Sequence, residues 1–172
     1  MKNKGEILAL DIYEHRIKLI EENSKRLGIN IIKTNINDAT KYEENYKEKF
    51  DKILLDVPCL GIGVLKRKPD IKWKKTKDDV EEISKVQLDI LLNCSKYLKQ
   101  NGKIVYSTCS IFKEENQNII DKFLEKNKNF KIEKIKMNKE NYFNKFITEK
   151  GAISIFQNEK TDGFFICKLI RK

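Results

Sequence analysis

The chain has 172 residues, a length that suits one domain with a sizeable core and disfavours two. Hydrophobic residues make up 40% and charged residues 36%, which is typical of a folded globular chain and unlike a disordered tail. Lys and Arg exceed Asp and Glu by 36 to 26, so the net charge of +10 favours polyanionic partners such as RNA or DNA. The lysines are spread along the chain, so a lysine-rich proteome explains the charge equally well.

Several classes of protein are disfavoured at this stage. No apolar run approaches the ~18–20 residues of a membrane span, and residues 1–6 lack the apolar stretch of a signal peptide, so we expect a cytoplasmic protein. A single histidine and the absence of any C-x-x-C pair argue against a metal site or a thioredoxin-type motif. The four scattered cysteines are Cys59, Cys94, Cys109 and Cys167.

Short apolar runs alternate with stripes of helical spacing along the chain. The predicted strands are residues 6–10, 31–34, 50–55, 103–108, 130–135 and 164–170, and the predicted helices are 15–27, 79–98 and 114–128. Gly28 ends the first of these helices, and Asn101-Gly102 ends the second. Strands separated by helices predict an α/β fold, a doubly wound and mostly parallel sheet in a single domain over residues 1–172.

Polar residues follow three of these strands, where ligands bind in doubly wound sheets. Asp11 follows the first strand. A carboxylate there either accepts both hydrogen bonds of a ribose diol or caps the next helix, and spacing does not decide between the two. Only Gly5 lies upstream, so the Gly-rich turn that normally precedes such an acid is missing.

The other two strand ends carry cysteines. Asp56, Val57 and Pro58 lead directly to Cys59, and the proline ends strand pairing, so the thiol is placed on a loop. Gly61 and Gly63 then allow close approach by a ligand. Cys109 holds the matching place after residues 103–108. A single cysteine is more often structural, as we expect for Cys94 and Cys167, but two at matching strand ends indicate a site.

A basic loop follows the first of these cysteines. Its cations are Lys66, Arg67, Lys68, Lys72, Lys74 and Lys75, and they surround Trp73. Such a loop either neutralises phosphates and stacks a base or is a solvated surface segment.

Four segments resemble motifs of the Sun/Fmu (RsmB-type) RNA cytosine-carbon-5 methyltransferases. Residues 56–64 (D-V-P-C-L-G-I-G-V) resemble the D-A-P-C-S-x-x-G motif, and residues 106–110 (Y-S-T-C-S) resemble the T-C-S motif. Residues 67–73 (R-K-P-D-I-K-W) are similar to the R-x-P-D-I-K-W segment of the bacterial ribosomal RNA members. Residues 162–165 match the closing D-G-F-F strand. The motifs occur in the family's order over nearly the whole chain.

The resemblance implies a Rossmann-like fold, S-adenosylmethionine as cofactor, and a cytosine in RNA as substrate, which leaves its stack to react. By resemblance, the Cys109 thiolate adds to carbon-6 of that base, which activates carbon-5 towards a methyl group, and Cys59 aids release. Asp56 would bind the base and lie near the cofactor. The remaining site residues implied are Asp11 and Asp38 for the cofactor, and Pro58, Lys66, Arg67 and Trp73 for the RNA.

One departure from the family pattern matters. The family's Gly-rich loop, its lysine and the first strand would lie before residue 1, and this absence would leave two central strands without ladder partners. We therefore expect the carboxyl-terminal catalytic part of a longer enzyme, which alone binds cofactor weakly or not at all.

Two alternatives stay open from the residues. One is a DNA cytosine methyltransferase, in which the proline-cysteine motif supplies the nucleophile. The other is a non-catalytic RNA-binding fragment that uses the basic loop. Amino-group methyltransferases are disfavoured, because they carry D-P-P-Y or N-P-P-Y where this chain has D-V-P-C.

Overall fold

The structure, a computed structural model, describes residues 1–71 and 75–172. Trp73, with Lys72 and Lys74 of the basic loop, lies outside the described residues. Two compact units are present, Met1–Tyr42 and Glu43–Lys172. The single domain over residues 1–172 stays a prediction.

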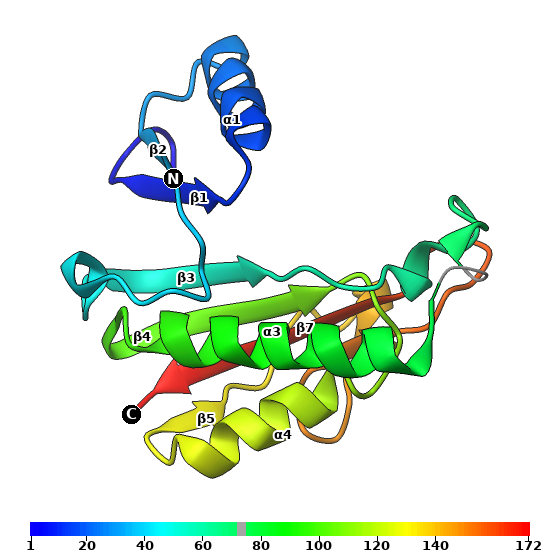
Figure 1. Ribbon diagram of the computed structural model, residues 1–172. Coiled ribbons are helices and arrows are strands. Elements are labelled where there is room, and N and C mark those ends of the chain that lie inside the picture. Colours follow the sequence, from blue (N-terminus) through cyan, green and yellow to red (C-terminus); the bar gives the residue numbers. More distant parts are fainter. Residues whose placement is uncertain (72–74) are drawn as a thin grey trace. The chain divides into compact units, whose positions relative to one another are not determined.

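The first unit is one β-α-β element (Figure 1). Its strands β1 (Ile7–Asp11) and β2 (Ile32–Ile36) pair in parallel, and α1 (Glu14–Arg26) connects them. Asn37 donates its N–H to the carbonyl of Asp11, at 3.0 Å. This bond continues the ladder past Asp11, so both strands end at the same edge.

The second unit contains a sheet in the order β3-β4-β7-β5, with β6 also paired to β7. The strands are β3 (Phe50–Asp56), β4 (Leu98–Thr108), β5 (Phe130–Ile132), β6 (Ile153–Ile155) and β7 (Phe164–Arg171). Only β3 and β4 are parallel in this sheet, and β7 runs antiparallel to its three partners. The helices are α3 (Lys77–Ser95) and α4 (Gln117–Lys126), with the 3-10 turns η1 (Glu44–Tyr46), η2 (Ile62–Val64) and η3 (Tyr142–Phe146).

The core of the second unit lies between its sheet and the helices α3 and α4, where α3 runs along β4 and packs against α4 (Figure 1). Fully buried side chains come from each layer, among them Leu91 of α3, Phe123 of α4, and Tyr106 of β4. Burial of each such side chain stabilises the fold by about 1.5–3 kcal/mol. Cys94 and Cys167 lie in this core, as expected, and burial raises the pKa of their thiols to about 11 and about 12.

The prediction for the end of α3 is wrong. The helix ends at Ser95, and β4 begins at Leu98 and passes through Asn101 and Gly102. Asn101 adopts φ 61°, and the ladder register jumps between the pairs of β3 and β4 that flank it. The Asn-Gly pair therefore forms a bulge in a strand and does not stop a helix. Leu98 is fully buried in the strand, as an apolar residue at the end of the predicted helix would also be. Apolar spacing alone therefore could not distinguish a helix from a strand here.

In the described part of the chain, strands β1 and β3, whose last residues are Asp11 and Asp56, have a single partner strand each. Among the described residues, β1 pairs with β2 alone and β3 pairs with β4 alone. Leu54 on β3, which is an edge strand of the described sheet, is 71% exposed.

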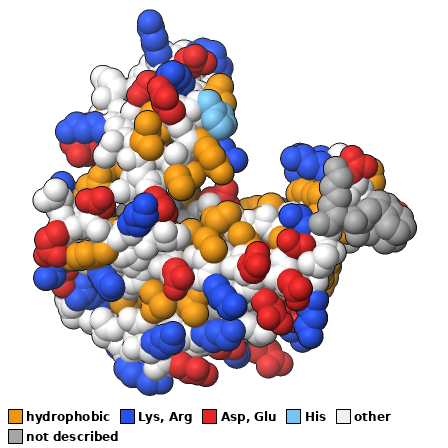
Figure 2. All heavy atoms as spheres, in the orientation of Figure 1, with side chains coloured by type: hydrophobic (Ala, Val, Ile, Leu, Met, Phe, Trp, Pro, Cys, Tyr) orange, Lys and Arg blue, Asp and Glu red, His pale blue; other side chains and the backbone are white. Residues whose placement is uncertain are grey.

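The surface of the described residues is mixed in charge. Cations and anions intermingle on the visible face (Figure 2). Within residues 1–71 and 75–172, no helix combines the length and apolarity that crossing a bilayer requires. No group of three or more His, Cys, Asp or Glu side chains is placed to hold a metal ion in the same residues.

Candidate active site

The loops after β3 and β4 bring two free thiols into contact. Because the two strands are parallel neighbours, their carboxyl ends reach the same edge. Val57 extends the ladder by donating its N–H to the Ser107 carbonyl at 3.2 Å, and Pro58 then ends it. The Sγ atoms of Cys59 and Cys109, fifty residues apart in sequence, lie 2.6 Å apart. The structure thus brings together the two cysteines that the strand ends indicated.

The two thiols differ in their titration. The hydrogen bond from Cys59 is the main cause that lowers the pKa of Cys109 to about 7, and the Cys109 N–H lowers it further. Burial and the negative charges of Asp56 and Glu115 oppose this shift. Cys59 moves the other way: the same contact and burial raise the pKa of its thiol far above its ordinary value. Near pH 7, Cys59 therefore stays protonated, and about half of Cys109 is thiolate.

Asp56 and Pro58 lie beside this pair. Asp56 is exposed at the end of β3, and the Ser107 hydroxyl donates to its Oδ1 at 3.0 Å. Pro58 is also exposed, and its carbonyl accepts a hydrogen bond from Nε2 of Gln87 on α3 at 2.8 Å.

A buried carboxylate, that of Glu115, connects the two cysteine loops. Its Oε2 accepts from the Leu60 N–H and from Gln87 Nε2, both at 3.0 Å, and its Oε1 accepts from the Ser110 hydroxyl. Leu60 follows Cys59 and Ser110 follows Cys109, so one side chain fixes both loops. Glu115 is fully buried, which helical periodicity did not predict, because an acid at the start of the predicted helix 114–128 resembles a solvated first-turn residue.

A contact between two glycines also holds the Cys109 loop. Gly63 donates its N–H to the Cys109 carbonyl at 2.9 Å and accepts from the Gly163 N–H at 2.8 Å. A Cβ atom on Gly63 would lie 2.2 Å from the Gly163 oxygen. The expectation that Gly63 admits a ligand is therefore wrong, because the backbone it admits is the chain's own. Gly61 is required for a different reason, its φ of +75°.

The two described cations assigned to RNA already contact their own chain. Lys66 donates to the Asn158 carbonyl at 2.8 Å, and Arg67 forms an ion pair with Asp162 at 2.5 Å. These bonds fasten residues 61–67 to residues 158–163. A role in RNA binding stays a prediction for Lys66 and Arg67, as it does for Trp73.

Two of the three acids assigned to the cofactor, Asp11 and Asp38, lie at one edge of the first unit, and the third, Asp56, lies in the second unit. Asn37, the neighbour of Asp38, is bonded to Asp11 through the backbone. Asp11 Oδ1 accepts from the Tyr13 N–H at 2.9 Å, so it supports the start of α1, although the N-cap residue is Tyr13. The Thr40 hydroxyl and N–H bind Asp38 Oδ1 and lower the pKa of Asp38. Each carboxylate has lone pairs for further donors.

Comparison with known families identifies the chain's relatives. The model of the family "16S rRNA methyltransferase RsmB/F" matches residues 1–170. The chain belongs to this family. The resemblance inferred from the motifs is thereby confirmed.

Two curated relatives are similar to the whole chain. The probable ribosomal RNA small subunit methyltransferase B of Bacillus subtilis is 39% identical over 100% of this chain. Ribosomal RNA small subunit methyltransferase B of Klebsiella pneumoniae is 34% identical over 98% of it. The chain spans only 39% and 37% of these relatives' lengths.

Solved structures confirm the α/β, Rossmann-like fold class. The crystal structure of PH0851 superposes with a TM-score of 0.87, at 36% identity over 98% of this chain and 38% of that one. NSun6 from Pyrococcus horikoshii, solved with SFG, gives a TM-score of 0.81 at 34% identity, over 99% of this chain and 42% of that one.

The first prediction concerns thiol reactivity. We expect alkylation of Cys109 by iodoacetamide to rise with pH through a midpoint near 7, because only the thiolate reacts. Cys59→Ala removes the donor that stabilises the thiolate, so this midpoint moves up towards the ordinary value of 9.0. Mass spectrometry of each peptide across pH gives the rates, with buried Cys94 as the internal control. An unchanged midpoint in Cys59→Ala would contradict the assignment.

The second prediction concerns Glu115. Glu115→Ala leaves the donors of Leu60, Gln87 and Ser110 unpaired in the interior, so we expect a loss of about 3 kcal/mol or more in unfolding free energy. Glu115→Gln keeps an oxygen for Leu60 and offers an amide that the Ser110 hydroxyl accepts, so its loss is smaller. Urea unfolding measures both variants. Equal stability of the alanine variant and the unsubstituted chain would show that the carboxylate does not hold the loops.

The third prediction compares two glycines. Gly63→Ala forces a methyl group against backbone oxygens, so we expect a loss of at least about 2–3 kcal/mol, as in overpacked cores. Gly61→Ala meets no atom closer than 3.4 Å and incurs only the strain of a positive φ, about 1 kcal/mol. The same urea measurement ranks them. A Gly61 variant less stable than the Gly63 variant would contradict the observed packing.

Proposed function

We propose that this chain carries the catalytic cysteines of an enzyme that methylates carbon-5 of a cytosine in small-subunit ribosomal RNA. Family membership and the names of the relatives support an RNA methyltransferase. The observation that carries the finer proposal is the contact of two oppositely shifted thiols, Cys59 and Cys109, at one edge of a Rossmann-like sheet. Such an enzyme would act in the cytoplasm, on RNA.

Cys109 is the nucleophile in this proposal. Carbon-5 of cytosine is a weak nucleophile, and addition of a thiolate to carbon-6 turns the ring into an enamine. The sulfur–carbon-6 bond forms while ring nitrogen-3 gains a proton from solvent by way of the exposed Asp56 carboxyl, so electron density moves to carbon-5. With a pKa of about 7, a large share of Cys109 is already thiolate at neutral pH, and no separate base is needed.

Asp56 orients the base. It is exposed at the edge where both thiols lie, and the Ser107 hydroxyl holds one of its oxygens. A carboxyl group in this place can hydrogen-bond ring nitrogen-3 and the exocyclic amine of a cytosine that has left its stack. Pro58, exposed beside it, would contact the same base.

S-adenosylmethionine fits the acids of the first unit. Asp11 and Asp38 lie at one strand edge as hydrogen-bond acceptors, which suits the donors of a ribose diol and of an adenine amino group. The related NSun6 structure was solved with SFG, an analogue of S-adenosylmethionine. When bound, this cofactor supplies the methyl group. The part of Asp11 and Asp38 is to hold its ribose and base.

Cys59 aids release of the product. Once the Cys109 sulfur is bonded to carbon-6, it no longer carries the charge that keeps Cys59 protonated. Cys59 can then give its proton to solvent and, as a thiolate, accept the proton on carbon-5 of the methylated ring. The double bond between carbon-5 and carbon-6 re-forms, Cys109 departs as a thiolate, and ring nitrogen-3 returns its proton to solvent by way of Asp56.

The raised pKa of Cys59 also bears on the DNA-type alternative. That alternative needs the cysteine of the proline-cysteine motif as nucleophile, and at neutral pH this thiol is protonated here. The split between the thiols therefore favours Cys109.

The fourth prediction tests the covalent step. We expect the chain, tested in a full-length context with saturating S-adenosylmethionine, to form a covalent adduct with RNA containing 5-azacytidine, whose carbon-6 is a better electrophile. Cys109→Ala abolishes the adduct. With ordinary cytosine RNA, Cys59→Ala accumulates an adduct that the unsubstituted chain releases.

Denaturing gel electrophoresis and peptide mapping measure these adducts, with Cys94→Ala as the matched control. An adduct mapped to Cys59 would favour the DNA-type enzyme. No adduct in the unsubstituted chain would favour the non-catalytic RNA-binding alternative.

A further inference from the structure

A groove of about 630 Å³ lies in the second unit, beside the loop that carries Cys109. One end is formed by Ile111 and Lys113, which follow that loop, and the walls are the first residues of α4 and residues 145–150. Phe156 and Phe165 complete the lining. The volume falls in the ~300–1,000 Å³ range of sites for drug-sized ligands, so a nucleotide fits.

The ladder ties this groove to the active thiol. Phe165 pairs with Thr108, the residue before Cys109, and Ile111 follows Cys109 by two positions. Phe156 follows Ile155, which pairs with Phe164 next to Gly163. Since Gly163 binds Gly63 and Gly63 binds the Cys109 carbonyl, the groove and the thiol share one support.

The lining combines exposed aromatic and cationic side chains. Phe156 is 63% exposed, although an aromatic ring of this size is normally buried. Lys145 Nζ lies 4.0 Å from the ring centroid of Tyr142 and 5.1 Å from that of Phe146. These contacts hold an ammonium group beside rings at the groove.

The charge of the lining favours an anionic occupant. The lining contains three lysines, at 113, 145 and 150, and one acid, Glu149. Lys150 forms an ion pair with Asp121 of α4 at 2.8 Å, so Lys113 and Lys145 provide the excess. Exposed rings stack on bases and lysines bind phosphates, which together is the chemistry of single-stranded nucleic acid recognition.

We propose that this groove binds the single-stranded RNA that flanks the target cytosine, with one base stacked on Phe156 and a phosphate at Lys145. This inference rests on the proposed function for the identity of the strand. It adds a substrate surface separate from the basic loop at residues 66–75, where two of the described cations, Lys66 and Arg67, already bind their own chain.

The fifth prediction measures binding of a fluorescent 12-nucleotide RNA to the 172-residue chain by anisotropy at several salt concentrations. Phe156→Ala weakens binding about tenfold and leaves the salt slope unchanged, because it removes stacking. Phe156→Tyr, the matched control, keeps the affinity. Lys145→Ala lowers the slope of log K against log salt by about 0.7, the value for one phosphate contact with a single strand.

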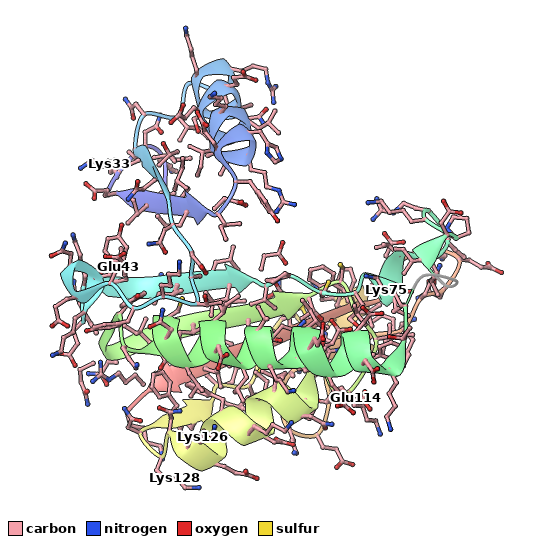
Figure 3. All side chains as sticks on the ribbon, in the orientation of Figure 1. Lys33, Glu43, Lys75, Glu114, Lys126 and Lys128 are labelled. Carbon is pink, nitrogen blue, oxygen red and sulfur yellow. The ribbon has the colours of Figure 1, made fainter. Side chains whose placement is uncertain are left out.

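Lys126→Ala is the control for charge. Lys126 is exposed and lies with Lys128 at the far end of α4 from Glu114, which directly follows the groove residue Lys113 (Figure 3). For Lys126→Ala, we expect the slope of log K against log salt to equal that of the unsubstituted chain. Equal changes of the salt slope in Lys126→Ala and Lys145→Ala would overturn the proposal, as would an unchanged RNA affinity of Phe156→Ala. A second copy of the chain that occupies the groove and excludes RNA would also overturn it.

The two proposals fail separately. Adduct formation at Cys109 with full activity and affinity in Phe156→Ala would refute the groove and leave the methyltransferase intact. Groove-dependent RNA binding without any adduct would refute the covalent chemistry and leave the groove intact.

Discussion

The hydrogen bond between two sulfur atoms is the interaction on which this account depends. A cysteine thiol in water has a pKa too high for much of it to be thiolate at neutral pH. Here a second thiol, and not a lysine or arginine, lowers that pKa. Cys59 supplies the stabilising donor, and the cost is its own protonation, because one proton serves both sulfurs. The same contact thus creates the difference between a nucleophile and a proton holder.

The scaffold keeps this contact in place through buried polar groups. The Glu115 carboxylate is fully removed from water, which costs several kcal/mol, and hydrogen bonds of about 1.5–3 kcal/mol each to a charged acceptor offset that cost. Its donors come from the segments that follow both cysteines and from α3. The negative charge of Glu115 also raises the pKa of Cys109. Glu115 therefore fixes the two loops but lowers the fraction of Cys109 that is ionised at neutral pH.

Sequence periodicity was enough for the elements that are locally determined. Apolar runs and helical stripes gave the β-α alternation, and parallel pairing then implied that the loops of Cys59 and Cys109 share an edge. Three features depend on distant partners and escaped this reasoning. The bulge at Asn101 is set by pairing with β3, Glu115 is buried by segments up to 55 residues away, and Gly63 is closed by Gly163. A residue type alone does not reveal which neighbour it meets.

The most direct test is a titration of the chain with ¹³C-labelled cysteine β-carbons, followed by NMR. The account predicts that Cys109 titrates near pH 7 and that Cys59 stays protonated beyond pH 9.0, its ordinary pKa. Two independent titrations near pH 9.0, or a lower midpoint for Cys59 than for Cys109, would contradict it.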